Sequence, residues 1–188
     1  MSEPHLVLVV EDDPSVAEFL QLALRAMGHE AVVAVDGQEA LEAAQEAERL
    51  GFNSVWTAEA YGSDALTPLA WWGARTETVK LGTAIMQMAA RTPAAAAMAA
   101  ITMDHLSNGR FILGLGASGP QVIEGFHGVP YEKPMPRIRD YINICRMTLK
   151  REKIVYDGPT VKVPLPDGEG TGLGLAIVRE QSEAIGGR

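Results

Sequence analysis

A glycine-rich turn is the first stretch whose residue types are suited to chemistry. Gly114, Gly116 and Gly119 follow a short apolar run that begins at Arg110. Glycine lets backbone N–H groups approach an anion closely and adopt a positive φ, so a strand that ends in such a turn is suited to receive a phosphate. The alternative is a tight turn after a core strand, with no ligand.

A pair of carboxylates is the second such stretch. Glu11 and Asp12 come directly after the apolar run 6–10, and paired carboxylates suit Mg²⁺. The alternative is that both are solvated while Asp13 caps a helix.

Alternating strand and helix patterns must position both stretches. Apolar runs of strand length alternate with segments whose apolar residues recur at helical spacing. We predict strands over 6–10, 31–35, 54–58, 79–86 and 111–115, helices over 14–27, 38–50, 66–74, 93–106 and 136–150, and a small hairpin over 154–163. Five βα units with short connections require a parallel sheet, so the predicted fold class is α/β.

Composition and charge exclude several classes of protein. The chain is 47% hydrophobic and 21% charged, and its net charge is −8. Residues 1–45 contain nine acidic residues and one basic residue. A surface that binds nucleic acid needs clustered Lys and Arg, so we expect no nucleic acid partner. The single cysteine, Cys145, excludes an intrachain disulfide, favours a reducing compartment and is predicted to be a core residue. We expect no signal peptide, no membrane span and a cytoplasmic protein.

Three stretches carry a family resemblance. They are AERLGFNSVWTAEAYGSDALTPLAWWGARTETVKLGTAIM, RTPAAAAMAAITMDHLSNGRFILGLGASGPQVIEGFHG and YEKPMPRIRDYINICRMTL, within residues 46–164. In this order they resemble the luciferase-like monooxygenases, in particular their deazaflavin-dependent oxidoreductases. The resemblance implies a partial TIM-barrel-like fold in which the strand ends hold a deazaflavin coenzyme or FMN.

The same resemblance implies individual site residues. Glu59 matches the position of an acid or histidine that faces the cofactor ring, and is the candidate catalytic residue. Two further segments are the candidate cofactor-binding residues: Thr83, Ala84 and Ile85, where the family often has a non-prolyl cis peptide, and Gly116, Ala117, Ser118 and Gly119 near the cofactor's phosphate. The alternative is that these residues serve packing only, since the family's first and last strands are missing or replaced. We expect Gly116→Val to weaken cofactor binding without abolishing the fold.

The two ends of the chain resemble other families. Residues 1–45 resemble the start of a response-regulator receiver domain, which implies an open doubly wound, flavodoxin-like sheet and a Mg²⁺ site at Glu11 and Asp12. The third strand ends at Glu59 rather than at an aspartate, so we expect no phosphotransfer. Residues 165–188 contain GTGLGLAIV, which resembles the lid of histidine-kinase ATPase domains; the other ATP-binding motifs are missing, so we expect no ATP binding.

These resemblances predict a mosaic: a receiver-like segment 1–45, a luciferase-like partial barrel 46–164 and a tail 165–188. We expect one structural domain over 1–150, followed by the hairpin and a C-terminal helix. Its open sheet edges would allow pairing into a homo-oligomer. The first functional hypothesis is an oxidoreductase acting on a small-molecule substrate, or an incomplete remnant of one. The alternatives are a chimeric α/β mosaic without ligand, and a Mg²⁺-binding signalling module without phosphotransfer.

Overall fold

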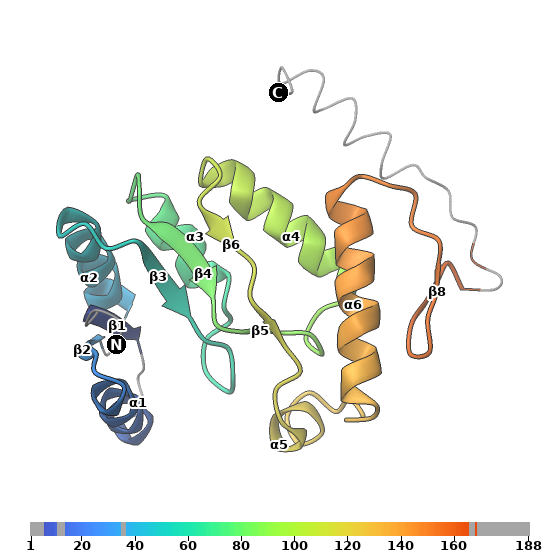
Figure 1. The fold of residues 1–188 in the computed structure, drawn as a ribbon, viewed down its shortest axis with the longest axis horizontal. Helices are drawn as coiled ribbons and strands as arrows, with labels where there is room; N and C mark the ends of the chain where they lie inside the picture. The colour runs from blue at the N-terminus through green and yellow to red at the C-terminus, as the bar shows by residue number, and fades with distance from the viewer. Residues whose placement is uncertain (1–5, 11–13, 35–36, 166–167, 169–188) are drawn as a thin grey trace. The chain divides into compact units, whose positions relative to one another are not determined.

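The computed structural model describes residues 6–10, 14–34, 37–165 and 168. They fall into two compact units: unit 1 comprises residues 1–87 and 100–118, and unit 2 comprises residues 88–99 and 119–188. The domain boundaries predicted after residues 45 and 164 stay predictions. The elements in chain order are β1 (Leu6–Val10), α1 (Pro14–Ala26), β2 (Glu30–Ala34), α2 (Gly37–Arg49), β3 (Ser54–Thr57), α3 (Thr67–Gly73), β4 (Lys80–Thr83), β5 (Met86–Gln87), α4 (Pro93–Leu106), β6 (Phe111–Ile112), β7 (Leu115–Gly116), α5 (Pro120–Ile123), α6 (Pro134–Leu149), β8 (Tyr156–Asp157) and β9 (Lys162–Val163) (Figure 1).

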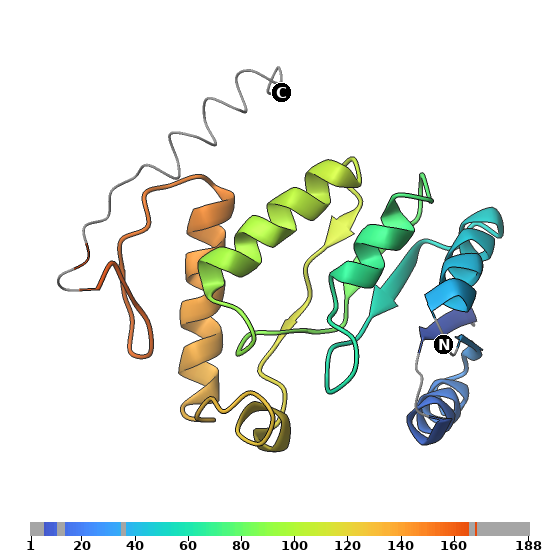
Figure 2. The ribbon, with the colours of Figure 1, turned by 180° about the vertical axis from the view of Figure 1, so that it is seen from behind.

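Parallel strand pairs form the framework of unit 1. β1 pairs with β2, β4 lies between β3 and β6, and β5 pairs with β7, all in parallel. Helix α3 covers one face of β3 and β4, as the front and back views agree (Figures 1 and 2). The predicted α/β class with a parallel sheet is therefore confirmed.

Two of the predicted strands are interrupted. The predicted strand 79–86 is divided into β4 and β5, and the predicted strand 111–115 is divided into β6 and β7. The Thr83 hydroxyl donates to the carbonyl oxygen of Gly114 (2.8 Å) and accepts from its N–H (2.9 Å). The N–H of Gly114 thus bonds to a side chain instead of the neighbouring strand, while its carbonyl oxygen also accepts from the Met86 N–H (2.9 Å), where the pairing resumes as β5 and β7.

The core of unit 1 lies between the helices and these strands. Fully or nearly fully buried side chains come from α2, α3 and β4, including Ala44, Leu69, Trp72 and Leu81. Small residues on α2 and large ones on α3 and β4 fill complementary volumes, which is the packing that a protein interior requires.

The Arg110 side chain connects backbone segments at the amino ends of the strands in unit 1 by hydrogen bonds. Its side chain donates five hydrogen bonds, which use the full donor capacity of a guanidinium. The acceptors are the carbonyl oxygens of Gly73, Thr76, Val79 and Ser107, together with the Thr76 hydroxyl. One side chain thus fixes the end of α3, the start of β4 and the end of α4.

Glu48, near the end of α2, also binds the connection between α3 and β4. Its carboxylate accepts hydrogen bonds from the backbone N–H groups of residues 77–79 and from the Thr78 hydroxyl. Desolvation raises the pKa of this carboxyl, but the hydrogen bonds outweigh it and lower the pKa to about 2. Glu48 is therefore ionised wherever the fold is intact at neutral pH.

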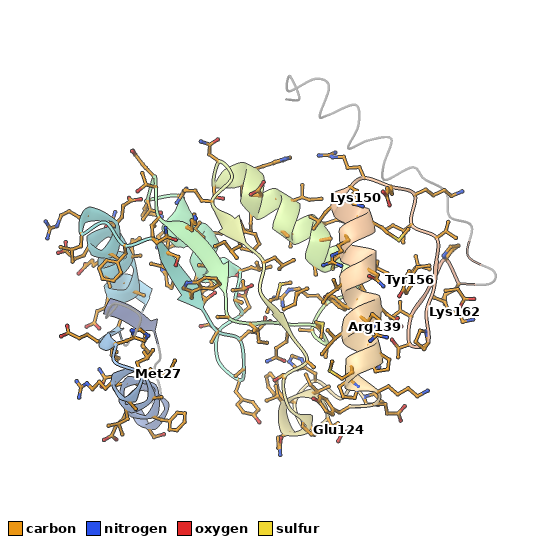
Figure 3. All side chains as sticks on the ribbon, viewed as in Figure 1. Met27, Glu124, Arg139, Lys150, Tyr156 and Lys162 are labelled. Atoms are coloured by element: carbon orange, nitrogen blue, oxygen red, sulfur yellow. The ribbon has the colours of Figure 1, made fainter. Side chains whose placement is uncertain are left out.

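Unit 2 is built on α6. Asp140, which is 1% exposed, accepts hydrogen bonds from the Tyr156 hydroxyl (2.9 Å) and from the N–H (2.8 Å) and hydroxyl (2.6 Å) of Thr160. These bonds hold the antiparallel hairpin β8–β9 on α6, beside which Tyr156 lies (Figure 3). Burial raises the pKa of Asp140, but the hydrogen bonds from Thr160, Tyr156 and Val161 outweigh it and the net shift is downward.

Cys145 is buried, as predicted for a core residue, and burial raises the pKa of its thiol to about 11.

Two helix boundaries in unit 2 differ from the prediction. Helix α6 begins at Pro134 rather than at residue 136, and the four-residue α5 was not predicted. Both start with proline, whose missing N–H is tolerated in the first helical turn. Within the described part of the chain, every helix is too short or too polar to cross a membrane.

Candidate functional site

Glu59 lies just beyond the carboxyl end of β3 and is bonded to the end of β5. Its Oε2 accepts a hydrogen bond from the backbone N–H of Gln87 (2.7 Å). In return, the Gln87 side chain donates from Nε2 to the Glu59 carbonyl oxygen (2.7 Å) and to that of Ala60 (3.3 Å). The predicted catalytic carboxylate is therefore fixed by a reciprocal pair of contacts between two strand ends.

The segment from Thr83 to Ile85 follows β4 directly. Thr83 is 1% exposed and pairs with Thr57 of β3, and the N–H of Ala84 donates to the Thr57 carbonyl oxygen (2.6 Å). The peptide bond between Ala84 and Ile85 is cis, at the place where the resemblance implied one. These three residues thus lie at the same end of the sheet as Glu59.

Gly116 brings the glycine-rich turn to this strand end. It is the register partner of Gln87 in the parallel pair β5–β7. A Cβ atom at Gly116 would lie 2.7 Å from Cγ1 of Ile85, so the absent side chain is what lets Ile85 pack there. Gly116→Val would therefore displace Ile85 as well, and does not test the turn alone.

The glycines of this turn are needed for close approach rather than for positive φ. Gly114, Gly116 and Gly119 all lack a positive φ, so that part of the prediction was wrong; the left-handed residue is Ser118, with φ 56°. At Gly114 a Cβ atom would lie 1.9 Å from the Thr83 carbonyl oxygen. The need for glycine there comes from the neighbouring strand, which is fixed backbone.

Unit 1 brings together most of the predicted site. Glu59, the segment 83–85 and Gly116 are connected by the contacts above, and Ala117 and Ser118 follow Gly116 in the chain. Gly119 belongs to unit 2, where it precedes the first residue of α5. Glu11 and Asp12, the predicted Mg²⁺ ligands, lie outside the described residues, and the described residues contain no group of three acidic, histidine or cysteine side chains that could hold a metal.

Gln87 is the residue that the sequence prediction missed. It is 0% exposed, and its Oε1 has no hydrogen-bond partner among the described residues. A polar residue in the run LGTAIMQM was the available signal, but the predicted strand ended one residue earlier, at Met86. The Glu59 carboxylate, the apolar side chain of Ile85 and the unused buried acceptor of Gln87 therefore lie at neighbouring strand ends.

The known proteins most informative about this chain are oxidoreductases. A protein of Mycobacterium tuberculosis named as a coenzyme F420-dependent oxidoreductase is 59% identical over 133 residues, which are 70% of this chain and 38% of that protein. The 5,10-methylenetetrahydromethanopterin reductase of Archaeoglobus fulgidus is 33% identical over 120 residues, which are 62% of this chain and 35% of that protein. The chain therefore spans little more than a third of the length of these two curated relatives.

Solved structures share the fold. The coenzyme F420-dependent tetrahydromethanopterin reductase of Methanopyrus kandleri has a TM-score of 0.65 at 20% identity, over 89% of this chain and 46% of that one. The oxygenating constituent of 3,6-diketocamphane monooxygenase from Pseudomonas putida, solved with FMN, has a TM-score of 0.60 at 20% identity, over 70% of this chain and 39% of that one. These neighbours are TIM-barrel-like, which favours the partial barrel over the doubly wound sheet.

The family assignment rests on most of the chain. The match to the luciferase-like monooxygenase family covers residues 16–172, including much of the segment that resembles a receiver domain and the start of the ATPase-like tail. The close relative, the shared fold and the connected strand ends agree with this match. The chain belongs to the luciferase-like monooxygenase family.

Proposed function

We propose that this chain forms part of an oxidoreductase that binds a deazaflavin coenzyme of the F420 type at the strand ends of unit 1. The observation that carries the proposal is the connection of Glu59 to Gln87 and of Gln87 to Gly116 across three strand ends. Parallel α/β barrels bind ligands at this end of the sheet. The name of the 59% identical relative favours F420; FMN is the alternative, since one structural neighbour was solved with it.

Each proposed residue has a role that its contacts support. When bound, a deazaflavin or flavin ring supplies the hydride chemistry. Ile85, packed against Gly116, gives an apolar wall, and the backbone of Ala117 and Ser118 supplies N–H groups for the cofactor's phosphate. Gly119, in unit 2, stays a predicted cofactor-binding residue.

Glu59 is the proposed acid–base residue. A substrate that is oxidised by hydride transfer gives up a hydride and a proton, and the Glu59 carboxylate takes the proton. The N–H of Gln87 donates to Glu59 Oε2 and so orients the carboxylate. The proposed substrate is a small molecule.

The other hypotheses have less support. A Mg²⁺-dependent signalling module depends on Glu11 and Asp12, which lie outside the described residues. A ligand-free mosaic does not explain the unpartnered buried oxygen of Gln87. The receiver-like and ATPase-like resemblances, the cytoplasmic location and homo-oligomer formation through open sheet edges stay predictions.

Thermal unfolding of the purified chain tests the proposal. A ligand at 100 times its dissociation constant stabilises the native state by about 2.7 kcal/mol, which raises the midpoint of a chain of this size by about 5–10 °C. We expect coenzyme F420 to produce this shift and FMN to produce a smaller one. The reverse order would assign FMN, and a midpoint unmoved by either ring would refute cofactor binding by this chain.

A single and a double variant then test whether the cofactor binds beside Gly116 and Ile85. Gly116→Ala places a methyl group against Ile85, and we expect it to weaken cofactor binding. Combining it with Ile85→Ala removes the Cγ1 and Cδ1 atoms that the methyl group would meet, which separates the clash from the loss of the wall. Lys162→Ala on the exposed hairpin of unit 2 is the control, and equal affinity in all these variants would place the cofactor elsewhere.

A further inference from the structure

Gln87 carries a buried acceptor that the fold itself does not use. The side chain is completely buried, and its Nε2 is committed to the carbonyl oxygens of Glu59 and Ala60. Its Oε1 is also buried and has no partner among the described residues. Leaving a buried polar group unpaired costs stability, so native proteins contain few such groups.

The orientation of this amide is fixed. If it were flipped, its oxygen would face the carbonyl oxygens of Glu59 and Ala60, and two acceptors would oppose each other. The free atom is therefore an acceptor, and only a donor can satisfy it. An ordered water molecule or an N–H or O–H group of a ligand meets that requirement.

The position of Gln87 favours a ligand. The residue follows Ile85 by two positions, is the register partner of Gly116 and orients the carboxylate of Glu59 through its backbone N–H. It therefore lies at the centre of the residues proposed to bind the cofactor. Flavin and deazaflavin rings share one imide N–H on their pyrimidine edge, and an amide oxygen is its complementary acceptor.

We propose that Gln87 Oε1 accepts a hydrogen bond from the imide N–H of the bound ring and thereby fixes the ring's orientation. The inference rests on the proposed function, because it requires the ring to bind at this strand end. A site built around an acceptor rejects an analogue that lacks the donor, since the acceptor is then left buried and unpaired. Gln87 would thus determine which edge of the ring enters the site.

Ligand analogues test this in the unaltered protein. FMN and its N3-methyl derivative differ only at the imide nitrogen, and the corresponding deazaflavin pair serves if F420 is the ring that shifts the unfolding midpoint. Titration followed by ring fluorescence should show the N–H form binding at least about tenfold more tightly than the N-methyl form. Equal affinities would overturn the inference while leaving the proposed function intact, and binding of neither form would overturn both.

Two variants separate hydrogen bonding from steric exclusion of the methyl group. Gln87→Met keeps the length of the side chain and removes the acceptor, so we expect the two forms to bind within about twofold of each other. Gln45→Met makes the same change at an exposed glutamine whose Nε2 donates to the Arg75 carbonyl oxygen, and the tenfold preference should persist. A preference that survives in folded Gln87→Met would show steric exclusion and overturn the inference; if that variant does not fold, the analogue titration decides.

Discussion

Replacing Arg110 by methionine should destabilise unit 1, because this residue, which directly precedes β6, holds the connection between α3 and β4 by hydrogen bonds. Methionine keeps the apolar stem of the side chain and removes its five hydrogen bonds. At about 1 kcal/mol for each bond the sum is about 5 kcal/mol. Arg110 is only partly buried, so water replaces some of the lost partners, and we expect a loss of about 3–5 kcal/mol.

Lysine at the same position separates charge from geometry. It keeps the positive charge but has three donors on one nitrogen, and cannot span acceptors on both sides of the connection. We expect Arg110→Lys to recover less than half of the loss. Arg75→Met is the matched control, because Arg75 is exposed, lies with its guanidinium carbon 3.5 Å from the Trp71 ring centroid and should cost at most about 1 kcal/mol.

Urea unfolding followed by tryptophan fluorescence measures these differences. Trp72 is 2% exposed and accepts a hydrogen bond from the Thr76 hydroxyl at its carbonyl oxygen, so its emission reports on this region. Equal slopes of free energy against urea would show that the variants unfold the same surface. An Arg110→Met protein within about 1 kcal/mol of the wild type, or no less stable than Arg75→Met, would refute a structural role for the five bonds.

Substitutions at Glu48 and at two glycines test individual contacts. Because the pKa of Glu48 is lowered to about 2, its stabilisation is complete above the ordinary value of 4.5 and is lost as the pH falls towards 2. Glu48→Gln should therefore cost about 1 kcal/mol at pH 7, allowing for solvent screening, and urea unfolding at a series of pH values should show this difference vanish near pH 2. Gly114→Ala should cost about 3 kcal/mol or more, since its Cβ atom would meet fixed backbone at Thr83, whereas Gly119→Ala would meet only the end of the Gln121 side chain at 3.2 Å. A stable Gly114→Ala protein in thermal unfolding would contradict the close approach.

The order of strands and helices was predictable because it depends on local patterns. Apolar runs and helical spacing identify β1, α1 and α2 within one or two residues. The interruption between β4 and β5 was not predictable in this way. There the N–H of Gly114 bonds to the Thr83 hydroxyl, thirty-one positions away, instead of to the neighbouring backbone, and residue periodicity carries no information about such a contact.

The candidate site was predictable only through resemblance to a family. From residue types alone, Glu59 and Gly116 could equally have served packing only. The structure shows that their strand ends are connected through Gln87. Gln87 was missed because a buried amide looks like the polar end of an apolar strand. Ser118, rather than a glycine, has the positive φ in the turn, because the glycines are required by their neighbours and not by their own backbone conformation.

The two ends of the parallel strands in unit 1 differ in how completely their polar groups are satisfied. At the amino ends, Arg110 uses its full donor capacity and Glu48 accepts from three successive backbone N–H groups. At the carboxyl ends, Gln87 leaves one buried acceptor without a partner among the described residues. A fold is most stable when its buried polar groups are all hydrogen-bonded, whereas an unused buried acceptor lowers stability unless a ligand supplies the donor. This asymmetry supports the proposal that the carboxyl ends of the strands bind a ligand while the amino ends have a structural role.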